Sequence, residues 1–402
     1  MRHMPTVITD AAVVDQFLSR AVENLYPSKD AFRAALLSGT RLTAYYGTDP
    51  TGPTLHLGHI ITLKKLGALQ KMGHRVVLLI GDFTAMIGDP TDKLAVRKQL
   101  TREEVVENSK RFKDQASKVL DFGGENPAEL RFNSEWLAKM TFADVVELAS
   151  NFTVQQMLER DMFETRIAEG KPVYLHEFLY PLMQGYDSVA LDTDIEIGGN
   201  DQTFNMLAGR TLLKALKNKE KFVLTNALLV DATGKKMGKT EGNMLALVDT
   251  PEDMYGKVMS WTDGMIVPGF RLCTDASEAE IADIERKMVA GENPIGFKRD
   301  LAHRITAWLS DAASAERAAA HFASVHQKGE IPSDAPEFAV GAGMNIVEAL
   351  VASKMCSSKS DARAQIEQGG VKIDGAAVSD IKATVVAGTV LQKGKRHFVK
   401  LV

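Results

Sequence analysis

The chain has 402 residues, of which 45% are apolar and 25% charged, with a formal net charge of −4. This balance is typical of globular proteins and excludes disordered, collagen-like and disulfide-scaffold chains, while the length predicts two or three domains. No apolar run approaches the roughly 20 residues that span a bilayer, so no membrane partner is expected. Two distant cysteines, Cys273 and Cys356, favour a reducing compartment, and hence a cytoplasmic protein.

The first half of the chain alternates strands and helices. Residues 42–46 are typical of a short strand; a turn rich in Gly and Pro follows, and then an amphipathic helix over 55–72. A second strand is expected at 74–80, charged amphipathic helices up to about residue 170, and further strands at 194–197 and 222–229. This order predicts an α/β fold, with a Rossmann-like, doubly wound parallel sheet over residues 1–235.

The second half changes composition twice. Residues 236–328 are charged and rich in helix formers, which predicts an α-helical domain, and residues 329–342 have the composition of a linker. The final unit, residues 343–402, carries nine Lys or Arg against five Asp or Glu. This tail is therefore basic, and the rest of the chain is acidic.

Two imidazoles stand three residues apart in His56-Leu57-Gly58-His59, at the expected start of a helix. They share one face and can contact one ligand. Helix N-termini attract phosphate, and Gly58 lacks the Cβ that would hold a purine ring off the backbone. Taken alone, the motif is more simply explained as two histidines satisfied by core or solvent.

A second segment, Lys236-Met237-Gly238-Lys239-Thr240, concentrates cations about 180 residues later. Alone it is most often a solvated basic turn. With a strand expected before each segment, the two together predict an ATP site in which Lys236 and Lys239 offset charge on the departing pyrophosphate while Thr240 donates a hydrogen bond. The expected chemistry is cleavage of ATP between its α and β phosphates by a bound acid.

A polar stripe runs along an otherwise apolar segment. Tyr180, Gln184 and Asp187 are spaced four and three apart, beside leucines and methionine. Such spacing places them on one helical face. Hydrogen-bonded core polar groups are the alternative to a binding pocket.

These segments resemble the HIGH and KMSKS signatures of class I aminoacyl-tRNA synthetases, and among them the bacterial-type tyrosyl-tRNA synthetase family. The resemblance is carried also by residues 45–51, 87–90, 180–187 and 198–202, in family order, and covers nearly the whole chain. It implies that L-tyrosine and ATP form tyrosyl-adenylate and pyrophosphate, and that tyrosine then passes to the 3′ end of tRNA(Tyr). Mg²⁺ is expected with the phosphates, no protein-held metal site is expected, and no prosthetic group is implied.

The resemblance also implies site residues. Tyr45 and Asp187 are expected on the substrate phenol and Tyr180, Gln184 and Asp89 on its ammonium group, with Thr84 and Gln202 completing the tyrosine pocket. ATP or the adenylate is expected to contact the residues Gly47, Asp49, Thr51, Gly58, Gly199, Asp201 and Lys239, beside the catalytic His56 and His59. Lys93 and Arg97 correspond to a cationic loop that closes on the transition state. No residue is expected to act as a nucleophile, because the substrate carboxylate attacks the α-phosphorus.

The sequence departs from the family pattern in two places. Gly238 and Thr240 stand where the eponymous signature has serines, although both lysines are present. Glu196 stands where some relatives carry Gln, so Glu196 is left outside the expected site.

The basic tail resembles an S-four-like RNA-binding fold of α+β type, in which Lys359, Arg363 and Lys372 would contact tRNA. A solvated basic face is the alternative. In the family, the helical middle domain and this tail together bind tRNA. A helical insertion, here about residues 133–170, forms a homodimer interface.

Three other functions compete with this interpretation. A tryptophanyl-tRNA synthetase would ordinarily lack both the tail and the stripe of Tyr180, Gln184 and Asp187. A small HxGH nucleotidyltransferase would explain neither the Lys236 segment nor three domains. A non-enzymatic RNA-binding regulator would be expected to have damaged active-site residues, whereas all of them are present here.

Overall fold

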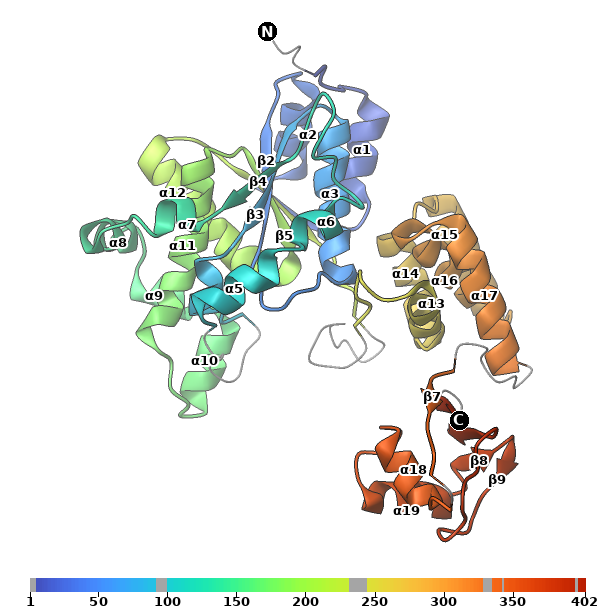
Figure 1. The fold of residues 1–402 in the computed structure, drawn as a ribbon. Coiled ribbons are helices and arrows are strands. Elements are labelled where there is room, and N and C mark those ends of the chain that lie inside the picture. Colours follow the sequence, from blue (N-terminus) through green and yellow to red (C-terminus); the bar gives the residue numbers. More distant parts are fainter. Residues whose placement is uncertain (1–4, 92–99, 231–243, 328–334, 342, 395–396) are drawn as a thin grey trace. The chain divides into compact units, whose positions relative to one another are not determined.

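The computed structural model describes residues 5–91, 100–230, 244–327, 335–341, 343–394 and 397–402. The chain forms two compact units, Met1–Thr250 with Lys257–Ile305, and Pro251–Gly256 with Thr306–Val402. Figure 1 shows the helices and strands of both. Within the described ranges, no helix is both long and apolar enough to cross a membrane.

A six-stranded sheet forms the centre of the first unit, in the order β1-β6-β5-β2-β3-β4. All neighbouring pairs are parallel except β1 with β6. The chain therefore extends the sheet in one direction from β2 and in the other from β5, which confirms the expected doubly wound topology. The strands are β1 Val22–Tyr26, β2 Thr43–Thr48, β3 Arg75–Ile80, β4 Glu129–Phe132, β5 Ile195–Gly199 and β6 Phe222–Asn226.

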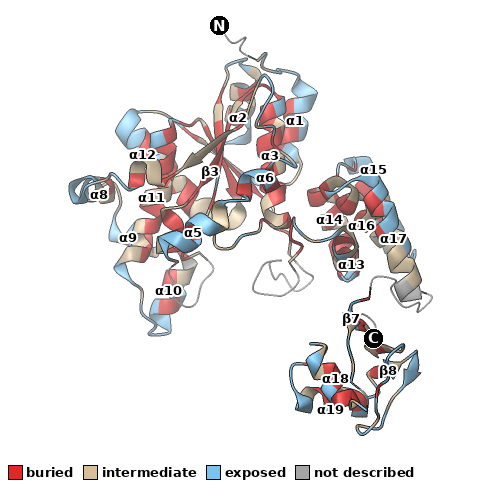
Figure 2. Ribbon diagram, viewed as in Figure 1, coloured by how far each residue is buried: buried red, intermediate tan, exposed pale blue. Residues whose placement is uncertain are grey.

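Helices cover both faces of this sheet (Figure 1). One face carries α1 Ala11–Ser19, α2 Lys29–Leu37 and α3 Leu57–Lys71, and the other carries α11 Leu175–Leu191 and α12 Thr203–Lys217. Figure 2 shows that the strands and the inward faces of these helices are buried. Because both faces are covered, β3 consists almost entirely of buried Val, Leu and Ile, as parallel strands require.

Two strands differ from the sequence prediction. β4 lies within the stretch expected to be helical, and the edge strand β1 was not predicted. β6 also ends three residues before the expected strand boundary at residue 229. Short helices complete the crossover between β3 and β4, namely α4 Thr84–Ile87, α5 Arg102–Ser109 and α6 Phe112–Ala116.

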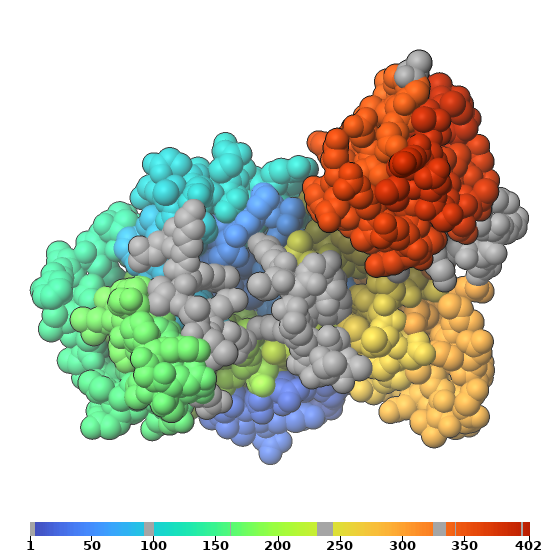
Figure 3. Space-filling view, turned by 90° about the horizontal axis from the view of Figure 1, so that it is seen from below, coloured from blue at the N-terminus to red at the C-terminus, as the bar shows by residue number. Residues whose placement is uncertain are grey.

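Four helices occupy the range expected for the insertion: α7 Ser134–Leu137, α8 Phe142–Ala149, α9 Val154–Leu158 and α10 Asp161–Ala168. The teal and green part of Figure 3 contains these helices, gathered on one side of the first unit. Side chains fix where two of them begin, since Thr141 accepts from the backbone of Asp144 and Thr153 from that of Gln156. The sequence therefore specifies their boundaries locally.

Residues 251–327 are helical, as predicted. They form α13 Pro251–Met259, the 3-10 turn η3 Asp263–Met265, α14 Ile266–Cys273, α15 Glu278–Val289, α16 Ile295–Leu309 and α17 Ala312–Gln327. Within the first unit, Arg20 donates to the carbonyl oxygens of Thr274 and Ala276, at the end of α14. Thr274 is the C-cap residue of α14, so its carbonyl group has no partner within the helix and a cation is favourable there.

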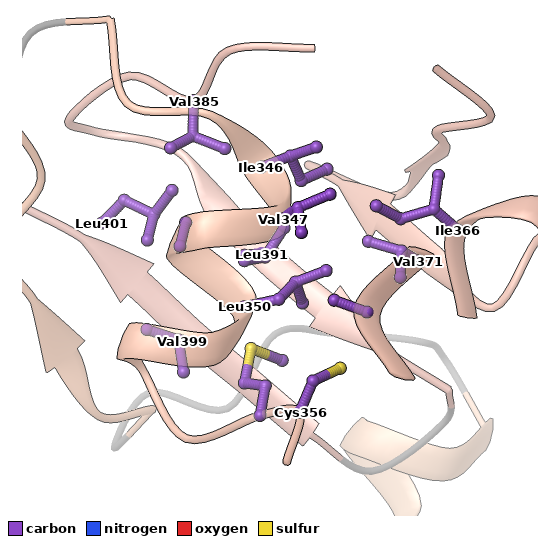
Figure 4. Packing of buried hydrophobic residues seen from close by; sticks show 13 residues of the cluster. Ile346, Val347, Leu350, Cys356, Ile366, Val371, Val385, Leu391, Val399 and Leu401 are labelled. Carbon is purple, nitrogen blue, oxygen red and sulfur yellow. The ribbon is translucent and has the colours of Figure 1, made fainter. Parts of the chain in front are cut away.

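The C-terminal part has its own core, shown in Figure 4. Its five-stranded sheet has the order β7-β11-β10-β8-β9, with two helices packed on it. Residues 337–338, expected to belong to the linker, instead form β7, which pairs parallel with β11. The elements are β7 Glu337–Phe338, α18 Ile346–Ala352, α19 Lys359–Glu367, β8 Val371–Ile373, β9 Ala376–Ala377, β10 Val390–Lys393 and β11 His397–Leu401.

Candidate active site

A cavity of about 350 Å³ opens at the carboxyl ends of β2 and β5. The strand order reverses between these two strands, which is where ligands bind in open α/β sheets. The described residues expected to bind tyrosine or ATP all line it: Tyr45, Gly47, Asp49, Thr51, His56, Gly58, His59, Thr84, Asp89, Tyr180, Gln184, Asp187, Gly199, Asp201 and Gln202. The other expected site residues, Lys93, Arg97, Lys236, Lys239 and Thr240, lie outside the described residues.

The two histidines form the beginning of α3. His56 is the N-cap residue, and its Nδ1 accepts from the backbone N–H of Gly58 at 3.2 Å, while Nδ1 of His59 accepts from the backbone N–H of His56 at 3.1 Å. A neutral imidazole whose Nδ1 accepts must carry its proton on Nε2. Both rings are therefore held as Nε2–H donors, and their centroids are only 3.8 Å apart.

Gly58, which is expected from the sequence to admit a purine, is also constrained by the ring of His56. A Cβ at this position would lie 3.0 Å from Cε1 of His56, so a side chain would crowd the capping ring. Gly199 is constrained in the same way, because a Cβ there would meet the carboxylate of Asp201. Glycine at these two positions leaves room for the ring of His56 and the carboxylate of Asp201.

Asp49 connects two parts of the cavity, one expected to bind ATP and the other expected to bind tyrosine. Its two carboxylate oxygens accept from Tyr180 Oη at 2.9 Å and from Thr84 Oγ1 at 2.7 Å. Burial, and then the charge of Asp49, raise the pKa of the Tyr180 phenol, so its hydroxyl remains a donor. Asp49 was expected only on the ATP side, yet it also positions Tyr180.

Tyr45 and Asp187 lie at the buried end of the cavity, 1% and 3% exposed. Asp187 accepts from Trp136 Nε1 at 2.8 Å and from Asn133 Nδ2 at 3.3 Å. Burial raises the pKa of the Asp187 carboxyl well above its usual range, and these two hydrogen bonds oppose that rise. Burial likewise raises the pKa of Tyr45, which keeps its hydroxyl protonated. This end can recognise a polar group on an otherwise apolar ring.

Asp89 and Gln202 meet directly, since Gln202 Nε2 donates to Asp89 Oδ2 at 2.7 Å. The other oxygen of Asp89 accepts from both the backbone N–H and the hydroxyl of Thr91, at 2.9 and 2.7 Å. These bonds hold the carboxylate in one orientation at the cavity wall. The sequence predicted both residues as pocket members but not their contact.

Several residues of the site were missed by the sequence analysis. Asn133 and Glu196 line the cavity, and Trp136 holds Asp187. Glu196 was left out, yet it accepts from Gln184 Nε2 at 3.3 Å and forms a fully buried ion pair with Lys221. A charged residue within an apolar strand was the available signal, because such a residue is seldom buried unless it is paired.

The expected RNA-contacting residues lie on the C-terminal part. Ser358 caps α19 by accepting from the backbone N–H of Asp361. Arg363 and Lys372 are exposed, whereas Lys359 is paired with Glu348 at 3.1 Å. Two of the three cations are thus presented to solvent with no ion pair found for them within the described part of the tail.

Two protein-family models match this chain. A family model described as "tRNA synthetases class I (W and Y)" matches residues 37–327, and one described as "Tyrosine--tRNA ligase SYY-like C-terminal domain" matches residues 328–401. The fold is that of a class I tRNA synthetase.

Individual relatives show which class I synthetases the chain is similar to. The tyrosine–tRNA ligase of Thermotoga maritima is 45% identical over 390 residues, covering 96% of each chain, and that of Bordetella avium is 45% identical over 90% of this chain and 89% of its own. A C-terminally truncated mitochondrial tyrosyl-tRNA synthetase from Coccidioides posadasii has a TM-score of 0.62 at 25% identity, covering 77% of this chain and 90% of its own. The chain belongs to the tyrosine–tRNA ligase family and is an enzyme of the class I aminoacyl-tRNA synthetases.

Proposed function

We propose that this enzyme condenses L-tyrosine with ATP to tyrosyl-adenylate and pyrophosphate, and then transfers tyrosine to the 3′ end of tRNA(Tyr). The observation that carries this proposal is a single cavity with two chemically different ends. The paired histidines at the start of α3 suit phosphates, while Tyr45 and Asp187 form a buried polar pair suited to a phenol.

Tyrosine occupies the end beneath β2 and α11 in this proposal. Its hydroxyl contacts Tyr45 and Asp187, and its ammonium group contacts Tyr180, Gln184 and Asp89. The carboxylates around this pocket favour the cationic ammonium. Phenylalanine is rejected because it offers no hydroxyl to the buried Tyr45 and Asp187, so the hydrogen bonds that tyrosine would make with them are lost. Thr84 and Gln202 act by orienting Asp49 and Asp89.

ATP lies across the N-terminus of α3 in this proposal, with Gly47, Asp49 and Thr51 on one side and Gly199 and Asp201 on the other. The Nε2–H groups of His56 and His59 donate to phosphate oxygens, and the dipole of α3 adds to their effect. The tyrosine carboxylate attacks the α-phosphorus, so positioning and electrostatics perform the catalysis. The proposed cations, Lys93, Arg97, Lys236 and Lys239 with the donor Thr240, rest on the sequence.

Mg²⁺ is proposed to arrive with the phosphates of ATP, since this ion keeps several waters and binds phosphate oxygens in ATP-using enzymes. Over the described ranges, no three His, Cys, Asp or Glu side chains are grouped as ligands for a metal ion. The chain's own part is to hold ATP at the N-terminus of α3.

The tail is proposed to bind tRNA through Arg363 and Lys372, with a smaller part for Lys359 because Glu348 already pairs with it. We keep the domain division of the sequence as part of this proposal: residues 1–235 catalytic, 236–328 helical and 343–402 RNA-binding. The residues between the last two, 329–342, are proposed as a connection that includes β7.

A homodimer is proposed through the insertion, since apolar side chains are exposed there and on the adjoining start of α11: Phe142, Val146, Val154, Ile167 and Leu175. Burying such side chains is the main driving force for association. The cytoplasm is proposed as the location, because Cys273 and Cys356 are free thiols, as a reducing compartment requires.

Charging of tRNA by the purified chain tests the proposal. With a bacterial tRNA preparation and ATP, each proteinogenic amino acid would be supplied in labelled form. Tyrosine alone should become attached, and Arg363→Ala/Lys372→Ala should lower charging while leaving ATP–pyrophosphate exchange intact. Attachment of another amino acid in preference to tyrosine would contradict the assignment.

A further inference from the structure

A buried ion pair lies directly behind the amino-acid end of the cavity. Lys221, just before β6, is 0% exposed, and Glu196, on β5, is 2% exposed. Nζ of Lys221 contacts three acceptors: the Glu196 carboxylate, Ser188 Oγ at 2.8 Å and the carbonyl oxygen of Met206 at 2.9 Å. Three acceptors match the three N–H donors of an ammonium, so the lysine is held in its charged form.

The fold makes room for this lysine. A Cβ on Gly209, in α12, would lie 2.5 Å from Lys221 Nζ and 2.7 Å from Ser188 Oγ. Burial lowers the pKa of the Lys221 ammonium, and the Glu196 carboxylate opposes that shift. Burying two charges is costly unless their geometry is satisfied, which suggests a role beyond stability.

From this arrangement we infer that the Glu196–Lys221 pair is a positioning device that fixes the hydrogen-bond direction at both ends of the tyrosine pocket. The inference rests on the proposed function and deepens it. It concerns how Gln184 and Tyr45 are oriented, rather than which groups touch the substrate.

At the ammonium end, Gln184 Nε2 lies 3.3 Å from Glu196 Oε1. A carboxylate oxygen only accepts, so the amide must present its NH₂ to Glu196. Its carbonyl oxygen then remains available to a cation in the cavity. Without a charged acceptor at position 196, the amide could turn and present its NH₂ to the substrate ammonium.

At the phenol end, Ser188 Oγ accepts from Lys221 and lies 2.9 Å from Tyr45 Oη and 3.4 Å from Glu196 Oε2. Either hydroxyl can donate in the Ser188–Tyr45 pair, and we assign the single hydrogen of Ser188 to Tyr45, the nearer of its two possible acceptors. The Tyr45 hydroxyl then keeps its own hydrogen for the substrate oxygen, whose phenolic hydrogen is left for Asp187. In this arrangement Lys221 donates to Ser188, Ser188 donates to Tyr45, and Tyr45 donates to the substrate oxygen.

The test measures tyrosine-dependent ATP–pyrophosphate exchange, together with the thermal midpoint, for Glu196→Gln, Lys221→Met and the double variant. Each single change should lower the midpoint, because it leaves one buried charge unpaired. The double change should recover much of that stability. Its KM for tyrosine should nevertheless remain raised by about tenfold, the size of one lost hydrogen bond to a charged group, with the KM for ATP unchanged.

Arg166→Met is the matched control, because Arg166 and Glu177 form another buried ion pair, 1% and 5% exposed at their side chains, that does not line the cavity. It should lower the midpoint without raising the KM for tyrosine. A double variant with the tyrosine KM and the tyrosine-to-phenylalanine ratio of the unaltered chain would overturn the inference and leave the pair a structural one.

Ser188→Ala keeps the test decisive if the charge variants fail to fold, since it removes only a neutral group. It should lower the preference for tyrosine over phenylalanine by about tenfold, while an unchanged preference would overturn the phenol half of the inference. If the unaltered chain itself showed no tyrosine-dependent exchange, the proposed function would fall, and this inference with it.

Discussion

Tyr180 donates a hydrogen bond of 2.9 Å to Asp49, joining α11 to the loop after β2 across 131 residues of sequence. Tyr180→Phe should therefore disturb both the ammonium contact and the orientation of Asp49. The loss of one hydrogen bond to a charged group predicts a fall of about ten- to a hundredfold in kcat/KM for tyrosine. Pyrophosphate exchange measures it. Tyr186→Phe, on the same helix but outside the cavity lining, is the control and should retain activity.

Gly81 follows β3 and lies against the same carboxylate. A Cβ at this position would overlap Asp49 Oδ1 and Thr84 Oγ1, so Gly81→Ala must displace one or both of them. We expect destabilisation of about 1–3 kcal/mol, as for overpacking elsewhere, and a larger fall in tyrosine activation. Gly256→Ala, where an added Cβ meets nothing within 4 Å, should leave activity unchanged and should not destabilise the chain, since alanine is favoured over glycine inside α13. Normal activity of Gly81→Ala would show that Asp49 need not occupy its observed position.

His74 should make the stability of the first unit depend on pH. Burial, and then the charge of Arg41, lower the pKa of its imidazole to about 4. The side chain is 0% exposed, and its Nδ1 accepts from the backbone N–H of Leu42. The unfolded chain takes up this proton below its ordinary pKa of about 6.5, whereas the folded chain resists until about 4. The free energy of unfolding that neutral His74 contributes above pH 6.5 is therefore lost as the pH falls toward 4.

Urea unfolding at pH 7 and pH 5 measures this loss. In His74→Asn, the amide oxygen can replace Nδ1 as the acceptor and has no proton to gain. The variant should lose less stability over that interval than the unaltered chain does. Equal losses would mean that other groups titrate in this interval instead.

Phe142 and Val146 lie four residues apart on α8, 84% and 53% exposed. If the insertion pairs two subunits, Phe142→Glu/Val146→Glu should place charge in the interface and dissociate the dimer. Sedimentation velocity would report the change in mass. A matched change at Val289 and Val386, which are also exposed but lie outside the insertion, should leave the mass unchanged. A dimer that survived the α8 change would place the interface elsewhere.

The parts of the fold that could be predicted from the sequence are those specified by local patterns. The Val- and Leu-rich β3 and the capped start of α3 follow from neighbouring residues, and so does the shared face of His56 and His59. β4 is only four residues long, none of them fully buried, so its pattern does not distinguish it from the charged helices around it. β1 lies at the sheet edge and has no fully buried residue, so apolar periodicity gives little signal for it.

The residues of the candidate site also differ in how far local sequence patterns predict them. The residues proposed to touch substrates belong to recognisable motifs, whereas those that orient them depend on long-range contacts. Glu196 can be understood only with Lys221, 25 residues further along the chain, and Asp187 only with Trp136, 51 residues before it. Such pairs are set by how strands and helices pack, which no local pattern reports.

The cavity at the carboxyl ends of β2 and β5 is proposed to recognise the phenol of tyrosine. Amino-acid-dependent ATP–pyrophosphate exchange on the full chain, with tyrosine, phenylalanine and tryptophan compared at equal concentrations, tests this proposal most directly. Exchange with tyrosine should far exceed exchange with the other two amino acids, and Asp187→Ala should abolish it. Exchange with tryptophan or phenylalanine that equals or exceeds the exchange with tyrosine would contradict the proposal.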